Sequence, residues 1–109
     1  MSREWRDRNR HKLSEYWARR EARKKGCATD DVGTAEFYER VRATEYVFCF
    51  YCGAKLSGKQ CHIDHITPLA RLGPHTPANL CESCPSCNLS KGSKTIAEWP
   101  DAKQLNYEI

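Results

Sequence analysis

The sequence has little apolar material and no long apolar run. Hydrophobic residues make up 39% of its 109 residues, and the mean hydropathy is −0.78. No stretch is long and apolar enough to span a membrane, and the start of the chain lacks the pattern of a signal peptide. These absences predict a cytoplasmic protein with no membrane contact. They also predict one small domain whose apolar core alone gives it little stability.

Cysteine, in contrast, is abundant, and the chain has seven. Four of them form two pairs with two residues between the members: Cys49 and Cys52, Cys84 and Cys87. Because this spacing lets a tight turn direct both sulfurs at one tetrahedral ion, two such knuckles predict a closed structural Zn²⁺ site. Scattered buried cysteines or disulfides are the alternative, which a reducing cytoplasm disfavours. The remaining three are interpreted as small buried or half-buried residues whose role the pattern leaves open: Cys27, Cys61 and Cys81.

Positive charge is concentrated in residues 1–25. This segment holds ten Lys or Arg against four acids, a net charge of +6, whereas the rest of the chain carries −2. Such a segment favours a nucleic-acid partner, because neutralising phosphates releases counterions. A solvated helix face is the alternative. The candidate nucleic-acid contacts are Arg3, Arg6, Arg10, Arg19, Arg20, Arg23 and Lys24.

Two helices are predicted before the first cysteine pair. Residues 3–25 lack Gly and Pro, which predicts one helix that ends at Gly26. A stripe of large side chains is expected to dock this helix onto the rest of the protein: Trp5, Leu13, Tyr16 and Trp17. The second helix is expected to begin with Thr34 as its cap and to run to about Tyr46. Its inward residues are predicted to be Phe37, Val41 and Thr44.

The rest of the chain predicts a hairpin and a helix, in one α+β domain over residues 1–109. The parts are basic helices over 1–46, a core over 47–92, and a short helix with a tail over 93–109. The expected elements are a strand at 47–50, a turn at 56–59, a strand at 61–66, a strand from Asn79 toward Cys84, a helix over 85–92 and a capping box with a short helix at 95–98.

Polar residues stand between and beside the cysteine pairs, in the order C-x-x-C, D-H-I-x-P-L, N-L, C-x-x-C-N-x-x-K-G. Taken singly, each would be an ordinary surface, turn or cap residue. Taken together over residues 47–92, they resemble the HNH endonucleases, whose ββα-metal core is a hairpin followed by one helix around a divalent ion. Many relatives have a histidine at the third signature position. This chain has Asn88 there and therefore resembles the H-N-N variant.

The resemblance implies a role for each signature residue. His65 would be the general base, Asp64 and Asn88 would bind the catalytic ion, and Asn79 would steady the loop and orient His65. Elementary chemistry agrees, because a neutral imidazole with a pKa near ~6.5 can take a proton from water. Carboxylate and amide oxygens suit Mg²⁺ or Mn²⁺. Strand alternation is expected to direct Asp64 and His65 to opposite faces.

Three further residues stand near the signature residues in the sequence. His62 shares the predicted face of Asp64, so it is either a further metal ligand or phosphate contact, or a hydrogen-bonded structural histidine. Lys91 is either a phosphate contact or part of a solvated helix end. His75, in the proline-rich loop, is expected to be exposed rather than catalytic.

The resemblance implies a divalent-metal-dependent endonuclease acting on DNA, with double-stranded DNA as the expected substrate. A monomer or weak dimer with one active site per chain would nick. Similar short proteins come from bacteriophages and mobile elements, so the expected setting is the cytoplasm of a bacterial host, with a larger packaging protein or nuclease as a candidate partner. Two alternatives stay open: a non-catalytic zinc module that binds nucleic acid, and an adaptor that docks through Trp5, Trp17 and the basic segment.

Overall fold

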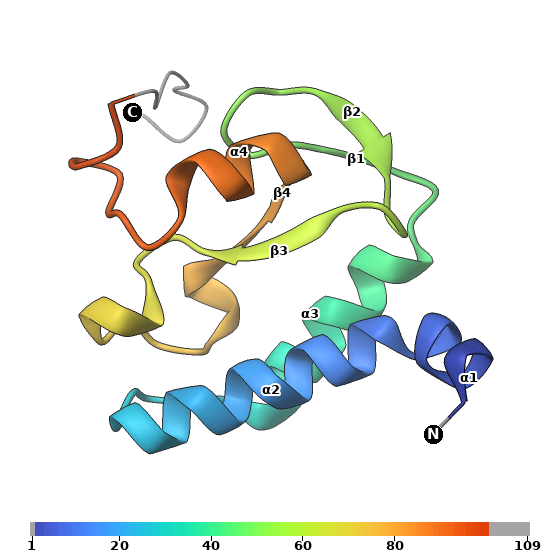
Figure 1. Cartoon of the computed structure of the whole chain (residues 1–109), viewed down its shortest axis with the longest axis horizontal. Coiled ribbons are helices and arrows are strands. Elements are labelled where there is room, and N and C mark those ends of the chain that lie inside the picture. The colour runs from blue at the N-terminus through green and yellow to red at the C-terminus, as the bar shows by residue number, and fades with distance from the viewer. Residues whose placement is uncertain (1, 101–109) are drawn as a thin grey trace.

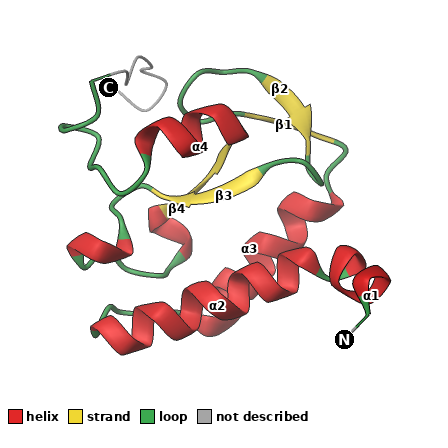
Figure 2. Cartoon of the chain, viewed as in Figure 1, coloured by secondary structure: helices red, strands yellow, loops and turns green. Residues whose placement is uncertain are grey.

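A computed structural model of the chain describes residues 2–100. Within this range the order of elements is α1 (Arg3–Arg8), α2 (Arg10–Lys25), α3 (Asp31–Ala43), β1 (Tyr46–Phe48), β2 (Lys55–Ser57), β3 (His62–His65), the 3₁₀ turns η1 (Leu69–Arg71) and η2 (Pro77–Asn79), β4 (Leu80–Ser83) and α4 (Pro85–Lys91). Strands and helices are mixed in one small α+β fold, as predicted (Figure 2). None of the helices in these residues has the length and apolar character needed to cross a membrane.

The centre of the fold is the hairpin β3–β4 with α4 packed against it. The strands are antiparallel, with Asp64 opposite Cys81 and His65 opposite Leu80. In Figure 1 this hairpin lies between α4 on one side and the helices α2 and α3 on the other. Helix α4 begins directly after β4 because Pro85 suits a first helical position, and it ends at Gly92, which has a positive φ of 56°. The predicted ββα arrangement is confirmed.

A second small sheet, β1–β2, holds the first cysteine pair. Tyr46 pairs with Ser57 and Phe48 pairs with Lys55. The prediction of a turn at 56–59 was therefore wrong in its first half, where a three-residue strand forms. This strand is followed by Gly58, where a Cβ atom would lie 2.1 Å from the Val41 carbonyl oxygen. The strand was missed because it has only three residues and is followed by Gly58, a glycine that the close approach of the end of α3 requires.

Two apolar clusters stabilise these elements. The first joins α3 to both sheets and consists of Phe37, Tyr38, Val41, Val47 and Leu80. The second surrounds the cysteine pairs and consists of Cys49, Tyr51, Cys81 and Trp99. Trp99 is buried in the second cluster and anchors the segment that follows α4. The cysteine cluster thus lies at the edge of this core layer, with Cys49 buried and Cys52 exposed.

The segment after α4 forms a turn and not the predicted short helix. The capping box is present: the Thr95 N–H donates to Glu98 Oε1 at 3.1 Å, and the Glu98 N–H donates to Thr95 Oγ1 at 3.3 Å. Pro100 follows closely, and the residue before a proline avoids helical backbone angles. The cap therefore has no helix to begin. The remainder of the predicted tail, 101–109, lies outside the described residues.

The basic N-terminal segment is two helices, whereas one was predicted. Asn9 interrupts it with non-helical backbone angles (φ −113°, ψ 21°), and its side-chain amide joins its backbone N–H in donating to the Trp5 carbonyl, at 2.8 and 3.0 Å. The predicted docking stripe was also wrong. Trp5, Tyr16 and Trp17 are between 40% and 56% exposed, whereas Glu15 and Ala22 of α2 are buried.

The reason lies in the close approach of α2 to α3. Ala22 on α2 and Thr34 on α3 are both fully buried, and small side chains allow two helices to pack at short range. The prediction that Thr34 caps this helix was wrong, because Thr34 lies inside α3. The cap is Asp30, whose carboxylate accepts the Gly33 N–H at 3.0 Å. Phe37 and Val41 face inward as predicted. The inward Thr44 and the end near Tyr46 were wrong, because Thr44 is exposed and Tyr46 belongs to β1.

Candidate functional site

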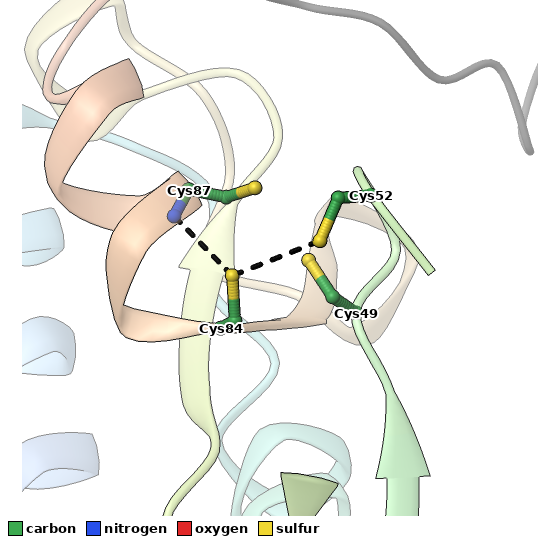
Figure 3. Close-up of side chains that lie close together, drawn as sticks. All are labelled: Cys49, Cys52, Cys84 and Cys87. Carbon is green, nitrogen blue, oxygen red and sulfur yellow. Dashed lines mark hydrogen bonds between the residues drawn. The ribbon is translucent and has the colours of Figure 1, made fainter. Parts of the chain in front are cut away.

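The four paired cysteines converge on one point. Their sulfur atoms all lie within 4.8 Å of one another, and the Sγ atoms of Cys52 and Cys84 are 3.8 Å apart (Figure 3). A zinc–sulfur bond of about 2.3 Å gives tetrahedral edges of about 3.8 Å, so the sulfurs are spaced to bind such an ion. The predicted cysteine cluster is confirmed as a candidate metal site, and four thiolates are the donor set that favours zinc.

Backbone hydrogen bonds bring the two pairs together. The Cys49 N–H donates to the Ala54 carbonyl at 2.8 Å, and Gly53 closes the turn with a φ of 80°. The Phe50 N–H donates to the Glu82 carbonyl at 2.9 Å, which joins this first turn to β4. Because Cys84 directly follows β4 and caps α4, the second pair lies beside the first.

On one face of β3, the Asp64 carboxylate is buried and held by two partners. Its Oδ2 accepts the Tyr51 hydroxyl at 2.5 Å and lies 3.1 Å from Lys91 Nζ. Burial, together with the hydrogen bond to Asp64, raises the pKa of Tyr51, so this hydroxyl stays protonated and donates. Lys91 is fully buried and also donates to the His65 carbonyl at 3.0 Å. Both predictions for Lys91 were wrong, because its ammonium group belongs to a buried ion pair.

On the other face of β3, His65 contacts a second histidine. His65 Nε2 lies 2.9 Å from His75 Nδ1, and His75 Nε2 lies 3.0 Å from Glu15 Oε2 on α2. Burial, then the neighbouring His75 and the positive charge of Lys91, lower the pKa of His65 to about 4. The imidazole of His65 is therefore neutral at neutral pH and can accept a proton.

His75 and Glu15 are the site residues that the sequence did not reveal. His75 was expected to be exposed, but its side chain is fully buried, and Glu15 is 5% exposed. They are 60 positions apart in the sequence, so no local spacing could have joined them. The only available signal was a carboxylate on the helical face that also carries Ala18 and Ala22.

Asn79 closes the loop that follows β3. Its Oδ1 accepts the Thr67 N–H at 2.9 Å, and its Nδ2 donates to the carbonyls of Thr67 and Pro74 at 2.9 and 2.8 Å. This is the loop-steadying contact that the resemblance implied. Among the described residues no hydrogen bond joins Asn79 to His65, whose ring nitrogen contacts His75.

Asn88 and His62 form a separate pair at the opposite end of the hairpin strand. The Asn88 Nδ2 lies 2.9 Å from His62 Nδ1, and His62 is exposed. The structure therefore places Asp64 with Lys91, His65 with His75, and Asn88 with His62. Helix α4, which carries Asn88, packs directly on β3, which carries Asp64 and His65.

The predicted nucleic-acid contacts fall into two groups. Arg3, Arg6 and Arg10 line one hollow beside α1, and Arg10 also lines a groove of about 240 Å³ that reaches Asn88. Further basic or polar residues of that groove are Arg42, Lys59 and His62. The second group makes contacts within the protein: Arg19 and Arg23 pair with Asp31, Lys24 pairs with Glu21, and Arg20 lies over the Trp17 ring.

Comparison with known proteins finds a family model that matches the central part of the chain. Residues 49–94 match the family model described as HNH endonuclease. The chain is 40% identical over 61 residues to the CRISPR-associated endonuclease Cas9 of Corynebacterium diphtheriae, and 38% identical over 52 residues to that of Actinomyces naeslundii. It is also 26% identical over 119 aligned positions to YoqL of the SPbeta prophage of Bacillus subtilis, whose name assigns it to the HNH endonucleases.

These similarities differ in extent. The matched segments cover 55% and 47% of this chain but only 5% of each Cas9 protein. The similarity to YoqL covers 94% of this chain and 46% of that protein. The chain therefore spans less than half the length of each of these relatives. No solved structure shows significant similarity to it.

Proposed function

We propose that the chain, whose residues 49–94 match the HNH endonuclease family model, hydrolyses phosphodiester bonds in double-stranded DNA with the help of a divalent metal ion. The observation that carries this proposal is the arrangement on β3. A neutral imidazole, His65, and a carboxylate, Asp64, project from opposite faces of one strand, and the helix packed on that strand carries Asn88.

In the proposed reaction His65 acts through Nδ1, since its Nε2 already contacts His75. Nδ1 takes a proton from a water molecule, and the water oxygen attacks phosphorus. The bond from phosphorus to the 3′-oxygen breaks, and this oxygen takes a proton from solvent. The products are a 5′-phosphate and a 3′-hydroxyl. Asn79 supports this step indirectly by closing the loop that follows His65.

The oxygen donors suit a hard divalent cation such as Mg²⁺ or Mn²⁺. Asp64 Oδ2 is engaged by Tyr51 and Lys91, so the proposed ligand atom is its Oδ1. Asn88 uses Nδ2 toward His62, which assigns the ligand role to its Oδ1. When bound, the ion supplies positive charge that stabilises the phosphate and the leaving oxygen. Zn²⁺, bound by the four cysteines, is proposed to have a structural role only.

DNA is proposed to follow the basic groove toward this strand. Arg3, Arg6 and Arg10 would contact backbone phosphates, and the groove that begins at Arg10 reaches Asn88. With one active site per chain, a monomer would nick, and a weak dimer could cut both strands. Action in a bacterial cytoplasm, beside a larger packaging protein or nuclease, completes the proposal. The similarity to a prophage protein supports this setting.

A relaxation assay on supercoiled plasmid tests the proposal. We expect nicked circles from the native chain with Mg²⁺ or Mn²⁺ and intact supercoils from His65→Ala, because removal of a general base costs roughly 10²- to 10⁴-fold in rate. Zinc content should be unchanged in this variant. Asp64→Asn is preferred to Asp64→Ala, since alanine would leave the buried Lys91 ammonium with the His65 carbonyl but no side-chain acceptor in place of Asp64.

Two results would contradict the assignment. Cleavage by His65→Ala at the native rate would exclude the general base. Restoration of activity by Zn²⁺ or Ni²⁺ alone would exclude the oxygen-ligated site. An RNA hairpin in the same assay determines which nucleic acid is cut, and lack of cutting of either substrate would favour the adaptor alternative, for which the exposed Trp5 and Trp17 provide a surface.

A further inference from the structure

A chain of three hydrogen-bonded side chains leads from the strand β3 to the N-terminal helices. Glu15 comes from α2, His75 from the loop between η1 and η2, and His65 from the end of β3. The contacts are 3.0 Å from Glu15 Oε2 to His75 Nε2 and 2.9 Å from His75 Nδ1 to His65 Nε2. The two imidazole rings lie with centroids 5.1 Å apart, tilted by 33°.

Every member of this chain is held in place by further contacts. The His75 N–H donates to the Ala28 carbonyl at 2.8 Å, and the His75 carbonyl accepts the Asp30 N–H at 3.1 Å. The Glu15 carboxylate accepts the Thr34 hydroxyl at 3.3 Å and lies 3.4 Å from Arg19. Polar groups that are buried and fully partnered in this way keep one orientation.

The donor and acceptor roles of these three side chains follow from the Glu15 carboxylate. An ionised carboxylate can only accept, so His75 Nε2 must carry a hydrogen. Arg19 lies 3.4 Å from the same carboxylate. With a single ring hydrogen, on Nε2, His75 accepts at Nδ1. His65 Nε2 must then be the donor, which leaves Nδ1 of His65 without a hydrogen.

We propose that Glu15 and His75 are positioning residues that hold His65 in the tautomer with its hydrogen on Nε2 and its Nδ1 lone pair available. This inference rests on the proposed role of His65 as general base. A ring with the other tautomer could not accept a proton from water at Nδ1. Once Nδ1 has taken that proton, His65 carries a positive charge and still donates through Nε2 to His75, whose own hydrogen bond to Glu15 stabilises this charge.

The proposed active site then extends beyond the segment that matches the family model. Glu15 lies on α2, outside residues 49–94. Helix α2 packs against α3 and contacts η1, and in Figure 1 it lies on the side of β3 opposite α4. The basic helices would therefore do more than bind DNA: one of their buried residues would set the protonation pattern of the reacting histidine.

Nitrogen-15 NMR of the imidazole rings tests the tautomer directly in the intact, zinc-loaded chain. We expect His65 to show a protonated Nε2 and an unprotonated Nδ1, and we expect Glu15→Gln to increase the population of the other tautomer. Glu36→Gln, on an exposed position of α3, is the matched control and should leave the spectrum unchanged. A native spectrum with the hydrogen of His65 on Nδ1 would overturn the inference, whether or not the protein cuts DNA.

Plasmid cleavage supplies the second readout. Glu15→Gln should lower kcat by roughly 10- to 100-fold, the range for loss of an orienting partner, with little change in KM and with native zinc content. The double variant Glu15→Leu with His75→Phe removes both polar partners together, so that no carboxylate is left buried alone, and it should lose at least as much activity.

The two failures are distinguishable. If the native chain cuts nothing, the proposed function is wrong, and the NMR result alone decides whether Glu15 and His75 set the tautomer. If His65→Ala abolishes cutting while Glu15→Gln and the double variant keep the native kcat, His65 is the base but the positioning role is overturned.

Discussion

Asp64 and His65 are neighbours on β3 but are held by two different parts of the protein. The partners of Asp64, Tyr51 and Lys91, belong to the part joined by the cysteine cluster, and the contact is a buried charge pair. His65 contacts His75 and, through it, α2, by hydrogen bonds between side chains. The two adjacent side chains thus depend on different forces, while Lys91 contacts both residues, through the Asp64 carboxylate and the His65 carbonyl.

Removal of the ion from the cysteines should have the largest effect on the folding of these two parts. A structural Zn²⁺ contributes folding free energy on the order of 10 kcal/mol, so its loss should unfold the part that holds Asp64. Chelation should abolish the native signal of the buried Trp99 indole. NMR or fluorescence records this signal, and zinc content is measured in parallel. Cys61→Ser, outside the cluster, is the control and should keep its zinc. A chelated protein with a native Trp99 signal would contradict the structural role.

Lys91→Met should remove the ion pair that holds Asp64 while the metal stays bound to the cysteines. It leaves the Asp64 carboxylate buried without its cation, which typically costs roughly 3–5 kcal/mol of stability. Thermal and urea unfolding measure the loss. Lys94→Met, at an exposed position, should change stability by no more than about 0.5 kcal/mol.

The combined variant Lys91→Met with Asp64→Asn makes this prediction sharper. Because both charges are then removed, much of the stability should return. If the single Lys91→Met variant were as stable as the native protein, the ion pair would not hold Asp64 in solution.

The smallest effects are expected at the surface of the basic helices. Arg6→Gln or Arg10→Gln should weaken DNA binding and lower the salt dependence of the binding constant by roughly one unit of slope for each phosphate that the variant no longer neutralises. Arg23→Gln should change it less, because Arg23 does not line the groove that reaches Asn88. Fluorescence anisotropy over a salt series measures these slopes. Equal effects of all three substitutions would show that the groove beside Arg10 does not direct the DNA.

Much of the central fold could be predicted because its signals are local. Two residues between cysteines fix the geometry of a metal-binding turn, and the proline and glycine that bound α4 act within a few residues of themselves. The same holds for Asn79, whose three hydrogen bonds all stay within its own loop. The identity of the signature residues also follows from their order along the chain.

The misjudged features depend on contacts between distant segments. The aromatic stripe of α2 seemed the natural face to bury, yet the close approach of α3 admits only small side chains at Ala22, and Glu15 is buried with it. Lys91 at a helix end looked solvated, but β3 supplies a carboxylate and a carbonyl for it. Charge and hydrogen-bond partners of this kind are decided by the folded arrangement, which periodicity within one helix does not contain.

Cys87 and Asn88 are consecutive residues of α4, so a single peptide unit links the proposed structural ion to a proposed ligand of the reactive one. The radius of whatever ion the sulfurs hold then sets where the amide oxygen of Asn88 can lie. Exchange of that ion for a larger thiophilic one should alter turnover although no substrate atom is near it, and the cysteines would thereby tune the enzyme as well as stabilise it.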